Sequence, residues 1–519
     1  MIQGTMSNAG KSILAGGLCR VFRQDGYRTA PFKSQNMALN SFITEDGLEM
    51  GRAQVMQAEA AGIAPRVEMN PVLLKPTSDT GSQVIVNGKV RGVMPAKEYY
   101  AYKKQLIPEI LHAYEILAGE HDIIVIEGAG SPAEINLKQD DIVNMGLAKM
   151  LKAPVLLVGD IDRGGVFAQL AGTLLLLEKE ERKMVKGLVI NKFRGDVDIL
   201  KPGLRMLEER TGCPVRGVIP YMYLDIDDED SLSERLQSRM QKGKIDIAAV
   251  RFPKISNFTD LNVLSCYEGV SVRYVDRPGQ FKDPDLVILP GTKNTMADLK
   301  WLKESGLAGK IQQAASRDVP VIGICGGYQM LGKKLSDPQA MEAGDGVPIS
   351  MEGLDLLPVE TIFTGQKKRT RAEGFVAASD DFWGGLGGCR LEGYEIHMGE
   401  TISAGGASFT GIRTMQEEGA RMEGCVQGSV CGTYLHGFFD SAEISGKLVE
   451  LLMRRKGLQV EDLKVLDFKA YKEEQYDQLA KMIREHLDMR YTGFWKKEYK
   501  GYENGTGTDS AGRDRAQKF

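Results

Sequence analysis

The feature that most constrains this chain stands at its start, where residues 4–12 read Gly-Thr-Met-Ser-Asn-Ala-Gly-Lys-Ser. A short apolar stretch leads into this segment, and a helix-like run follows Lys11. Such a loop, placed between a strand and a helix N-terminus, points backbone N–H groups and a lysine at phosphate groups. The segment therefore predicts an α/β fold with a parallel sheet and a nucleoside triphosphate at its edge.

The loop departs from the usual spacing G-x-x-x-x-G-K-[ST], which would place the first glycine at Thr5. Glycine stands one position earlier, at Gly4, and this variant resembles the P-loop of the dethiobiotin synthetase branch. The entry strand, residues 1–3, is shorter than usual, so we expect the natural chain to begin upstream of Met1. The residues expected to contact ATP are Thr5, Asn8, Gly10, Lys11 and Ser12, with the Ser12 hydroxyl also on Mg²⁺.

Buried apolar runs alternate with amphipathic stretches up to about residue 222. Apolar strands that alternate with helices indicate a parallel sheet covered on both faces. The expected strands are 123–126, 155–158, 188–190 and 215–219, and the expected helices follow Lys11 and cover 96–118, 169–177 and 200–210.

A second alternation begins at residue 245. Strands are expected at 245–250, 270–275, 286–289 and 319–324, and helices at 261–266, 295–304 and 328–333. The region 335–430 is Gly-rich and predicts short antiparallel strands, and helices are expected at 443–454 and 473–488. We therefore expect an ATP-binding domain at 1–224, a linker at 225–244, a second α/β domain at 245–495 and a disordered tail at 496–519.

Three polar residues outside the loop are candidates for the same site. Glu127 leaves a buried strand into a Gly turn, a position suited to Mg²⁺ or to orienting a reacting carboxylate. Lys33 ends another apolar stretch, where it would steady a phosphate or a carboxylate. Asn191 has the donor and acceptor that would read an adenine edge, although a loop cap would look the same in the sequence.

Cys325 stands in Gly-Ile-Cys-Gly-Gly, between an expected strand and an expected helix. The glycines permit the tight turn that lifts a nucleophile clear of a sheet. The backbone N–H of Gly326 and that of Gly291 are the expected oxyanion donors. A thiol placed in this way attacks an amide and forms an acyl-enzyme, as in a glutamine amidotransferase.

The base that accompanies a cysteine nucleophile should be a histidine, and the chain has five. His436 ends a strand-like run and is the first candidate, whereas His397 would shape the site. The remaining six cysteines are scattered without metal-ligand spacing, which favours reduced thiols and a cytoplasmic location.

Composition excludes several other classes of protein. With 66 Lys plus Arg against 70 Asp plus Glu, the net charge of −4 gives no electrostatic case for nucleic acid or an anionic membrane. No apolar run approaches the roughly 20 residues that span a bilayer. The oligomeric state is not readable, and a homo-oligomer remains open.

Taken together, the motifs resemble the adenosylcobyric acid synthase family over residues 1–490. The segments that carry the resemblance include the phosphate loop, Lys33-Ser-Gln-Asn-Met-Ala-Leu-Asn-Ser41, Gly159-Asp-Ile-Asp-Arg-Gly-Gly165, Ile255-Ser-Asn-Phe-Thr-Asp260 and Gly432-Thr-Tyr-Leu-His436. The resemblance implies that Cys325 and His436 release ammonia from glutamine. It further implies that ATP and Mg²⁺ activate carboxylates b, d, e and g of the corrinoid adenosylcobyrinic acid a,c-diamide for amidation.

One position departs from the wider glutamine amidotransferase group, in which Glu usually follows the histidine by two residues. Here that residue is Phe438, so we expect a Cys–His dyad, with Asp440 a guess for an orienting carboxylate. Two alternatives stay open: a cobyrinic acid a,c-diamide synthase, and a P-loop nucleotide-switch protein without glutaminase activity.

Overall fold

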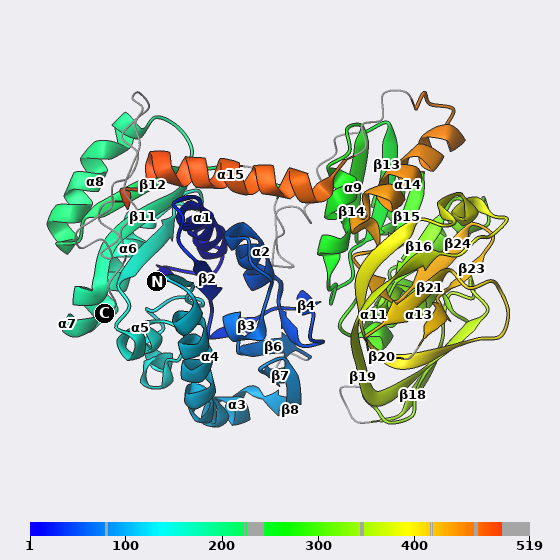
Figure 1. The fold of residues 1–519 in the computed structure, drawn as a ribbon, viewed down its shortest axis with the longest axis horizontal. Coiled ribbons are helices and arrows are strands. Elements are labelled where there is room, and N and C mark those ends of the chain that lie inside the picture. The colour runs from blue at the N-terminus through cyan, green and yellow to red at the C-terminus, as the bar shows by residue number, and fades with distance from the viewer. Residues whose placement is uncertain are drawn as a thin grey trace.

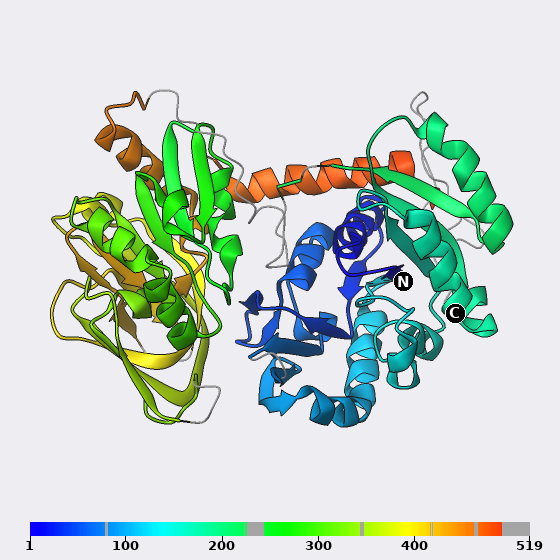
Figure 2. The ribbon, with the colours of Figure 1, turned by 180° about the vertical axis from the view of Figure 1, so that it is seen from behind.

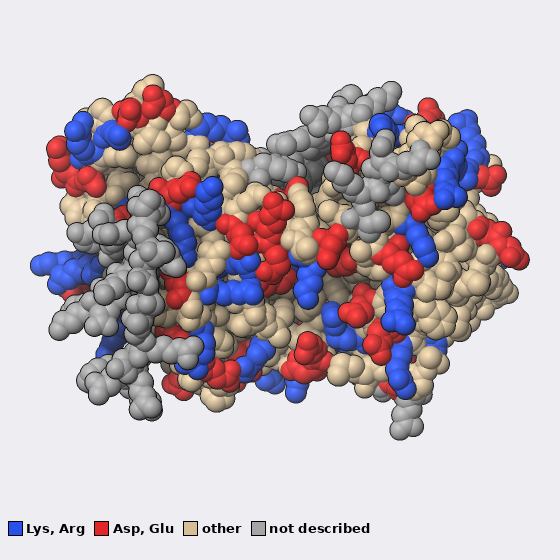
Figure 3. All heavy atoms as spheres, turned by 45° about the horizontal axis from the view of Figure 1, so that its top comes forward, with Lys and Arg blue, Asp and Glu red and all other residues tan. Residues whose placement is uncertain are grey.

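The computed structural model describes residues 1–77, 81–222, 224–225, 243–342, 347–415, 417, 419–460 and 466–489. Two α/β halves lie side by side, and a long C-terminal helix runs across the top of the N-terminal half (Figures 1 and 2). On the face drawn in Figure 3, acidic and basic side chains are interspersed over both halves. None of the described helices combines the length and apolar character that crossing a bilayer would require.

The N-terminal half is built on a parallel sheet, as the sequence predicts. Its strands run in the order β1-β10-β11-β12, and a parallel bridge from Ile2 to Glu127 joins β1 to the β2-β9 pair. The strands are β1 (Ile2–Gly4), β2 (Thr29–Phe32), β9 (Ile123–Ile126), β10 (Val155–Asp160), β11 (Val185–Phe193) and β12 (Val215–Pro220).

Helices cover both faces of this sheet, because successive strand residues point to opposite sides. Leu157 packs with the helices of one face, whereas Leu156 and Val158 pack with α1 on the other. The helices of this half are α1 (Lys11–Gln24), α2 (Arg52–Ala61), α3 (Ala96–Tyr102), α4 (Ile107–Glu120), α5 (Met145–Leu151), α6 (Val166–Leu176), α7 (Lys179–Met184) and α8 (Val197–Thr211).

Short strands between residues 35 and 95, which the sequence did not reveal, form an extension toward the C-terminal half. A mixed sheet has the order β3-β6-β7-β8, and β4 pairs antiparallel with β5. In Figure 1, β4 is the element of this extension that reaches toward β20. These strands are β3 (Gln35–Met37), β4 (Ser41–Ile43), β5 (Glu49–Gly51), β6 (Val72–Pro76), β7 (Gly81–Val86) and β8 (Lys89–Pro95).

The C-terminal half contains the second predicted parallel sheet, in the order β14-β13-β15-β16-β24-β23, in which only the edge strand β23 is antiparallel. Its strands are β13 (Ile245–Val250), β14 (Val270–Val275), β15 (Leu286–Leu289), β16 (Val321–Ile324), β23 (Cys425–Gln427) and β24 (Val430–Thr433). Its helices are α9 (Asn262–Ser265), α10 (Pro278–Phe281), α11 (Thr295–Glu304), α12 (Leu307–Ala315), α13 (Gly326–Leu331) and α14 (Ala442–Arg455).

The Gly-rich region forms the expected antiparallel strands beside this core, with β17 and β19 as its one parallel pair among the described strands. The strands are not all short, because β19 has 18 residues and β20 has 14. The members are β17 (Lys334–Asp337), β18 (Ile349–Glu352), β19 (Val359–Val376), β20 (Arg390–Ser403), β21 (Thr410–Thr414), β22 (Ala420–Glu423) and β25 (Leu435–His436).

The last described helix, α15 (Phe468–His486), corrects the expected domain plan. The sequence placed 245–495 in one C-terminal unit, yet Leu479 and Ile483 pack against α1 of the N-terminal half. Arg20 on α1 pairs with Glu473 and Asp477 of α15 at 2.8 and 2.7 Å. The expected linker, apart from residues 225, 243 and 244, and the expected tail lie outside the described residues.

Candidate active sites

The phosphate loop joins β1 to α1 and is fixed against the end of β11. Gly10 has φ of 90°, and a Cβ built on it would lie 2.1 Å from the Asn191 amide nitrogen. That nitrogen donates a hydrogen bond to the carbonyl of Ala9 at 2.9 Å. Glycine is therefore required at residue 10 both by the left-handed backbone and by the close approach of Asn191.

Hydrogen bonds to backbone carbonyls hold the Lys11 side chain inside the loop. Its Nζ donates to the carbonyls of Met6 and Gly130, at 2.9 and 3.1 Å, and its stem passes about 3.0 Å from where a Cβ on Gly4 would lie. The first turn of α1 carries no acidic residue. A helix N-terminus with a lysine beside it favours bound phosphate groups.

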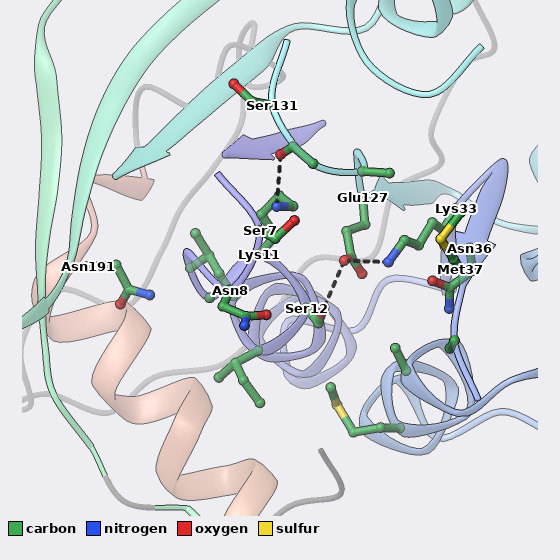
Figure 4. A pocket seen from close by; sticks show the side chains of 18 of the residues that line it. Ser7, Asn8, Lys11, Ser12, Lys33, Asn36, Met37, Glu127, Ser131 and Asn191 are labelled. Carbon is green, nitrogen blue, oxygen red and sulfur yellow. Dashed lines mark hydrogen bonds and ion pairs between the residues drawn. The ribbon is translucent and has the colours of Figure 1, made fainter. Parts of the chain in front are cut away.

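Glu127 is the centre of a buried polar cluster at the end of β9 (Figure 4). Its Oε1 accepts hydrogen bonds from Ser12 at 2.7 Å and from Lys33 at 2.9 Å, and its Oε2 accepts from Gln57 at 2.6 Å. Burial opposes ionisation, but the Lys33 charge and the hydrogen bonds from Ser12, Gln57 and Lys33 hold the pKa of Glu127 below its ordinary value. The carboxylate is thus kept charged beside the phosphate loop.

Ser12 and Glu127 fit the share of a Mg²⁺ site that a protein usually supplies to a bound nucleotide. Magnesium takes one or two protein oxygens and completes its shell with phosphates and water. Among the described residues, no group of three or more His, Cys, Asp or Glu side chains forms a separate metal site. The adjacent Ser12 hydroxyl and Glu127 carboxylate are therefore the candidate ligands.

A cavity of about 1380 Å³ opens from the phosphate loop toward the C-terminal half. Asn8, Gly10, Lys11, Ser12, Lys33, Glu127 and Asn191 line it, together with residues 35–39. Its far wall includes Asn262 and Tyr274 of the C-terminal half, and Met482 and Ile483 of α15. Both halves and the last helix thus surround one space.

Cys325 occupies the turn between β16 and α13 and has φ of 52° and ψ of −110°, a conformation uncommon for a residue with a side chain. Close packing fixes the turn, since a Cβ on Gly327 would lie 1.9 Å from the Leu289 carbonyl oxygen. The Sγ lies 3.5 Å from the carbonyl oxygen of Ile396. This is the geometry of a nucleophile elbow, with strain stored at the reactive residue.

His436 lies beside this cysteine, in β25, and is almost fully buried. Its Nδ1 donates to Asp260 Oδ2 at 2.7 Å, and the N–H of Gly437 donates to Asp260 Oδ1 at 3.0 Å. Burial disfavours the charged ring, but the Asp260 carboxylate and hydrogen bonds to Asp260 and Cys325 raise the pKa of His436 to about 10. Nδ1 faces Asp260, so Nε2 is the ring nitrogen available to Cys325.

Comparison with known proteins identifies the type of domain in each half. Residues 1–231 match the CobQ/CobB/MinD/ParA nucleotide binding domain, and residues 246–444 match the CobB/CobQ-like glutamine amidotransferase domain. The chain is 57% identical to the cobyric acid synthase of Ruminiclostridium cellulolyticum, over 97% of this chain and 98% of that protein. It is 56% identical to the cobyric acid synthase of Lachnoclostridium phytofermentans, over 94% and 97%. The chain belongs to the cobyric acid synthase family.

Membership in the cobyric acid synthase family confirms the resemblance carried by the motifs and the two-part α/β architecture. It also sets aside the nucleotide-switch alternative, because the C-terminal half matches a glutamine amidotransferase domain.

Asp260 is the functional residue that the sequence did not reveal. A Cys–His dyad was expected, with Asp440 as a guess, but the carboxylate on the imidazole is Asp260, 176 residues earlier in the chain. Its segment, Ile255-Ser-Asn-Phe-Thr-Asp260, stood out as a family motif, and that was the available signal. Nothing local marks an aspartate as the partner of so distant a histidine.

Two residues expected to contact the nucleotide also make contacts within the protein. Asn191 donates one N–H of its side-chain amide to the Ala9 carbonyl, which is the loop-cap contact that the sequence left open, and it also lines the cavity. Its contact with adenine stays a prediction. Thr5 does not line the cavity, because its backbone N–H donates to Val158 and its hydroxyl donates to Gln169 at 3.0 Å. Its role is to anchor the loop to β10 and α6.

Gly326 and Gly291, the two expected oxyanion donors, both lie close to the Cys325–His436 pair. A Cβ on Gly326 would lie 2.7 Å from Thr292 Cγ2, so the loop 290–292 packs directly on the cysteine turn. A Cβ on Gly291 would lie 3.1 Å from His436 Cε1. His397 is set apart from proton transfer, because its ring stacks on Tyr434 with centroids 3.6 Å apart and burial lowers its pKa to about 3.

Proposed function

We propose that this chain hydrolyses glutamine at Cys325 and uses the ammonia to amidate side-chain carboxylates of a corrinoid, with ATP as the activating reagent. The observation that carries the proposal is the pairing, in one member of the cobyric acid synthase family, of a Cys325–His436–Asp260 site with a phosphate loop. Either site alone would serve a simpler enzyme. Together they supply ammonia and an activated acid.

Release of ammonia begins with attack of the Cys325 sulfur on the carboxamide carbon of glutamine. The raised pKa of His436 keeps the ring protonated at neutral pH, so the proton that the departing amine needs is already held at Nε2. Ammonia leaves and a thioester remains. Water, deprotonated by the now neutral imidazole, then attacks the thioester and releases glutamate, which restores the thiolate and the imidazolium.

The N-terminal site makes the acceptor reactive. A carboxylate is a poor electrophile, so transfer of the γ-phosphoryl group of ATP to its oxygen creates an acyl phosphate with a good leaving group. Lys11 and the N-terminus of α1 stabilise the phosphate charge, and Lys33 stands where a carboxylate or phosphate oxygen would enter. Ammonia then displaces phosphate, and the products are an amide, ADP and inorganic phosphate.

Mg²⁺ is the metal that the Ser12 and Glu127 oxygens would hold, and it would neutralise charge on the transferring phosphates. Glu127 is already ionised and oriented by Gln57 and Lys33. Its second oxygen, Oε2, accepts hydrogen bonds from the neutral side-chain amides of Gln57, at 2.6 Å, and Gln54, at 3.4 Å.

For the acceptor we propose adenosylcobyrinic acid a,c-diamide, amidated at carboxylates b, d, e and g. The cavity volume of about 1380 Å³ exceeds the roughly 300–1,000 Å³ of most small-molecule pockets, which leaves room for a large acceptor beside ATP. The sibling activity, amidation at positions a and c, is the competing enzyme function.

The decisive experiment supplies the purified protein with ATP, Mg²⁺, glutamine and either cobyrinic acid or its a,c-diamide, and counts the amides formed by mass spectrometry. Addition of four amides to the a,c-diamide supports the proposal. Amidation that stops at positions a and c would assign the sibling activity instead. The variant Cys325→Ala should accept ammonium chloride but not glutamine as the nitrogen source.

A further inference from the structure

One stretch of chain, residues 33–41, connects the two active sites. It begins at Lys33, whose Nζ lies 2.9 Å from Glu127 Oε1 beside the phosphate loop. Residues 35–39 line the cavity between the halves. Asn36 also donates to Gln54 at 3.0 Å, and Gln54 in turn reaches Glu127. A ligand in the cavity would therefore touch this stretch directly.

The next two residues of the stretch contact the C-terminal half at Asn257. The N–H of Asn257 donates to Asn40 Oδ1 at 2.6 Å, and the N–H of Ser41 donates to Asn257 Oδ1 at 3.2 Å. All three residues are buried. In a buried contact of this kind each donor depends on its partner, because water does not replace a lost acceptor.

Asn257 controls the backbone that carries Asp260. Its φ of 52° is left-handed, a conformation that asparagine tolerates better than most residues but that its surroundings must hold in place. Its carbonyl accepts a hydrogen bond from the N–H of Asp260 at 3.1 Å, which closes the turn. The position of the Asp260 carboxylate, and hence of the His436 ring, follows from this turn.

A second connection reaches the same histidine through Tyr394 of β20. Its hydroxyl donates to the Ser41 carbonyl at 3.1 Å and accepts from Asn257 Nδ2 at 3.3 Å. Its ring stacks on the imidazole of His436, with centroids 5.3 Å apart and planes 25° from parallel. Both routes from Ser41 thus end at His436. One runs through Asn257 to Asp260, the hydrogen-bond partner of the imidazole, and the other runs through Tyr394 to the face of the ring.

We propose that Asn257 and Tyr394 are positioning residues through which the stretch 33–41 sets the geometry of the glutaminase site, so that glutamine hydrolysis responds to the contents of the ATP and acceptor cavity. The inference rests on the proposed function. Residues 35–39 contact the ligands in the cavity. A shift of these residues moves Asn40 and Ser41, and through Asn257 it changes the positions of Asp260 and the His436 ring. Ammonia is then released when an activated acceptor is present to consume it.

The test is the variant Asn40→Ala, which removes the acceptor for the Asn257 N–H and replaces no residue of either chemical site. Three rates are measured: glutamine hydrolysis alone, glutamine hydrolysis with ATP, Mg²⁺ and cobyrinic acid a,c-diamide, and amidation driven by ammonium chloride. A misplaced catalytic group costs about 10- to 100-fold in rate. We therefore expect stimulated glutaminase kcat to fall by that factor, with KM for glutamine nearly unchanged and ammonium-driven amidation retained.

Tyr394→Phe is the second variant, because it keeps the ring over His436 and removes only the hydroxyl that crosses to Ser41. It should lose the stimulation by ATP and acceptor. The matched control is Arg369→Ala, which breaks a different contact between the halves, from Arg369 to the Gly88 carbonyl, without touching Asn257. The control should keep wild-type stimulation.

Wild-type stimulation in Asn40→Ala and Tyr394→Phe would overturn the inference. Loss of ammonium-driven amidation along with glutaminase would also overturn it, since that result means general damage to the fold. A wild-type protein that neither hydrolyses glutamine nor amidates the corrinoid would instead contradict the proposed function.

Discussion

Asp260 binds the imidazole of His436 through one carboxylate oxygen, at 2.7 Å, and the backbone N–H of Gly437 through the other, at 3.0 Å. Both oxygens of the carboxylate are therefore used to fix one histidine and the residue after it. This arrangement fixes the orientation of the ring and leaves Nε2 for the sulfur of Cys325. The carboxylate comes from a distant segment of the chain, whereas the resemblance to the wider amidotransferase group would place a glutamate at the position of Phe438.

The first prediction concerns that carboxylate. Asp260→Asn should lower glutaminase kcat by about 10²- to 10⁴-fold, the range that an oriented general acid–base contributes. Amidation driven by ammonium chloride should persist, because the phosphate loop is untouched. The control is Asp440→Asn, which alters the exposed aspartate near the same strand and should retain wild-type hydrolysis. The reverse ranking of the two variants would return Asp440 to the site.

The second prediction is a dependence of stability on pH. The pKa of His436 is raised to about 10 in the fold, against about 6.5 for an unfolded imidazole. A raised pKa means that the folded state binds the proton more tightly, so this stabilisation is complete below about pH 6.5 and is lost as the pH rises through about 10.

The comparison that isolates this group is the difference in Tm between the wild type and Asp260→Asn. The difference should be at its full size at and just below about pH 6.5 and should shrink steadily toward about pH 10. A difference that stays constant over this range would show that the imidazolium is not what Asp260 stabilises.

Much of the fold follows from sequence because the strands are apolar and buried. Ile245–Val250, Val270–Val275 and Leu286–Leu289 form as expected to the residue, because apolar side chains dominate each of them and only Asp246, Ser271 and Arg273 interrupt the runs. The strands β3 and β5 escaped notice because they are three residues long and contain polar side chains such as Gln35 and Glu49. Period alone gives no signal at that length.

The candidate sites divide in the same way. Lys11, Ser12 and Cys325 stand in motifs whose chemistry is local, so the residues around them were informative. Asp260 binds a histidine that is 176 residues away in the sequence, and Asn191 binds the phosphate loop at Ala9, 182 residues away in the sequence. Contacts of that kind are set by how strands meet at a sheet edge, which the sequence does not display.

The third prediction tests the required glycine of the phosphate loop. Gly10→Ala combines an unfavourable φ of +90° with a clash against Asn191, so nucleotide binding should be lost. Gly26→Ala is the matched control, because it has a φ of +87° and open space around it, and should cost only about 1–2 kcal/mol of stability. Calorimetric titration with an ATP analogue distinguishes the two. Wild-type affinity in Gly10→Ala would contradict the packing of Asn191 on the loop.

The fourth prediction concerns the ion cluster that joins the halves. Glu49 is fully buried and pairs with Lys75 at 2.9 Å and with Lys367 of β19 at 2.7 Å. Burial opposes its ionisation, but the two lysine charges hold the pKa of Glu49 well below its usual range. The carboxylate therefore serves two cations at once.

Glu49→Gln leaves both ammonium groups without their anion and should cost about 3–5 kcal/mol of stability, the range for breaking a buried pair. Lys367→Met leaves the Glu49–Lys75 pair intact and should cost less. Urea denaturation of both variants provides the ranking. Equal costs would mean that the second lysine, not the shared carboxylate, dominates the contact.

The fifth prediction asks to which half the last helix belongs. Ile483 of α15 is fully buried, and a Cβ added to Gly17 of α1 would lie 2.1 Å from its Cδ1, so the two helices touch without a gap. Ile483→Ala should cost about 2–5 kcal/mol of stability through the cavity it leaves. Lys481→Ala, two residues away and exposed, should change stability by no more than about 0.5 kcal/mol.

Because Ile483 also lines the cavity beside the phosphate loop, its loss should weaken ATP-dependent amidation while basal hydrolysis of glutamine continues. A variant that instead loses basal glutaminase and keeps ammonium-driven amidation would place α15 functionally with the C-terminal half, as its order in the chain suggests.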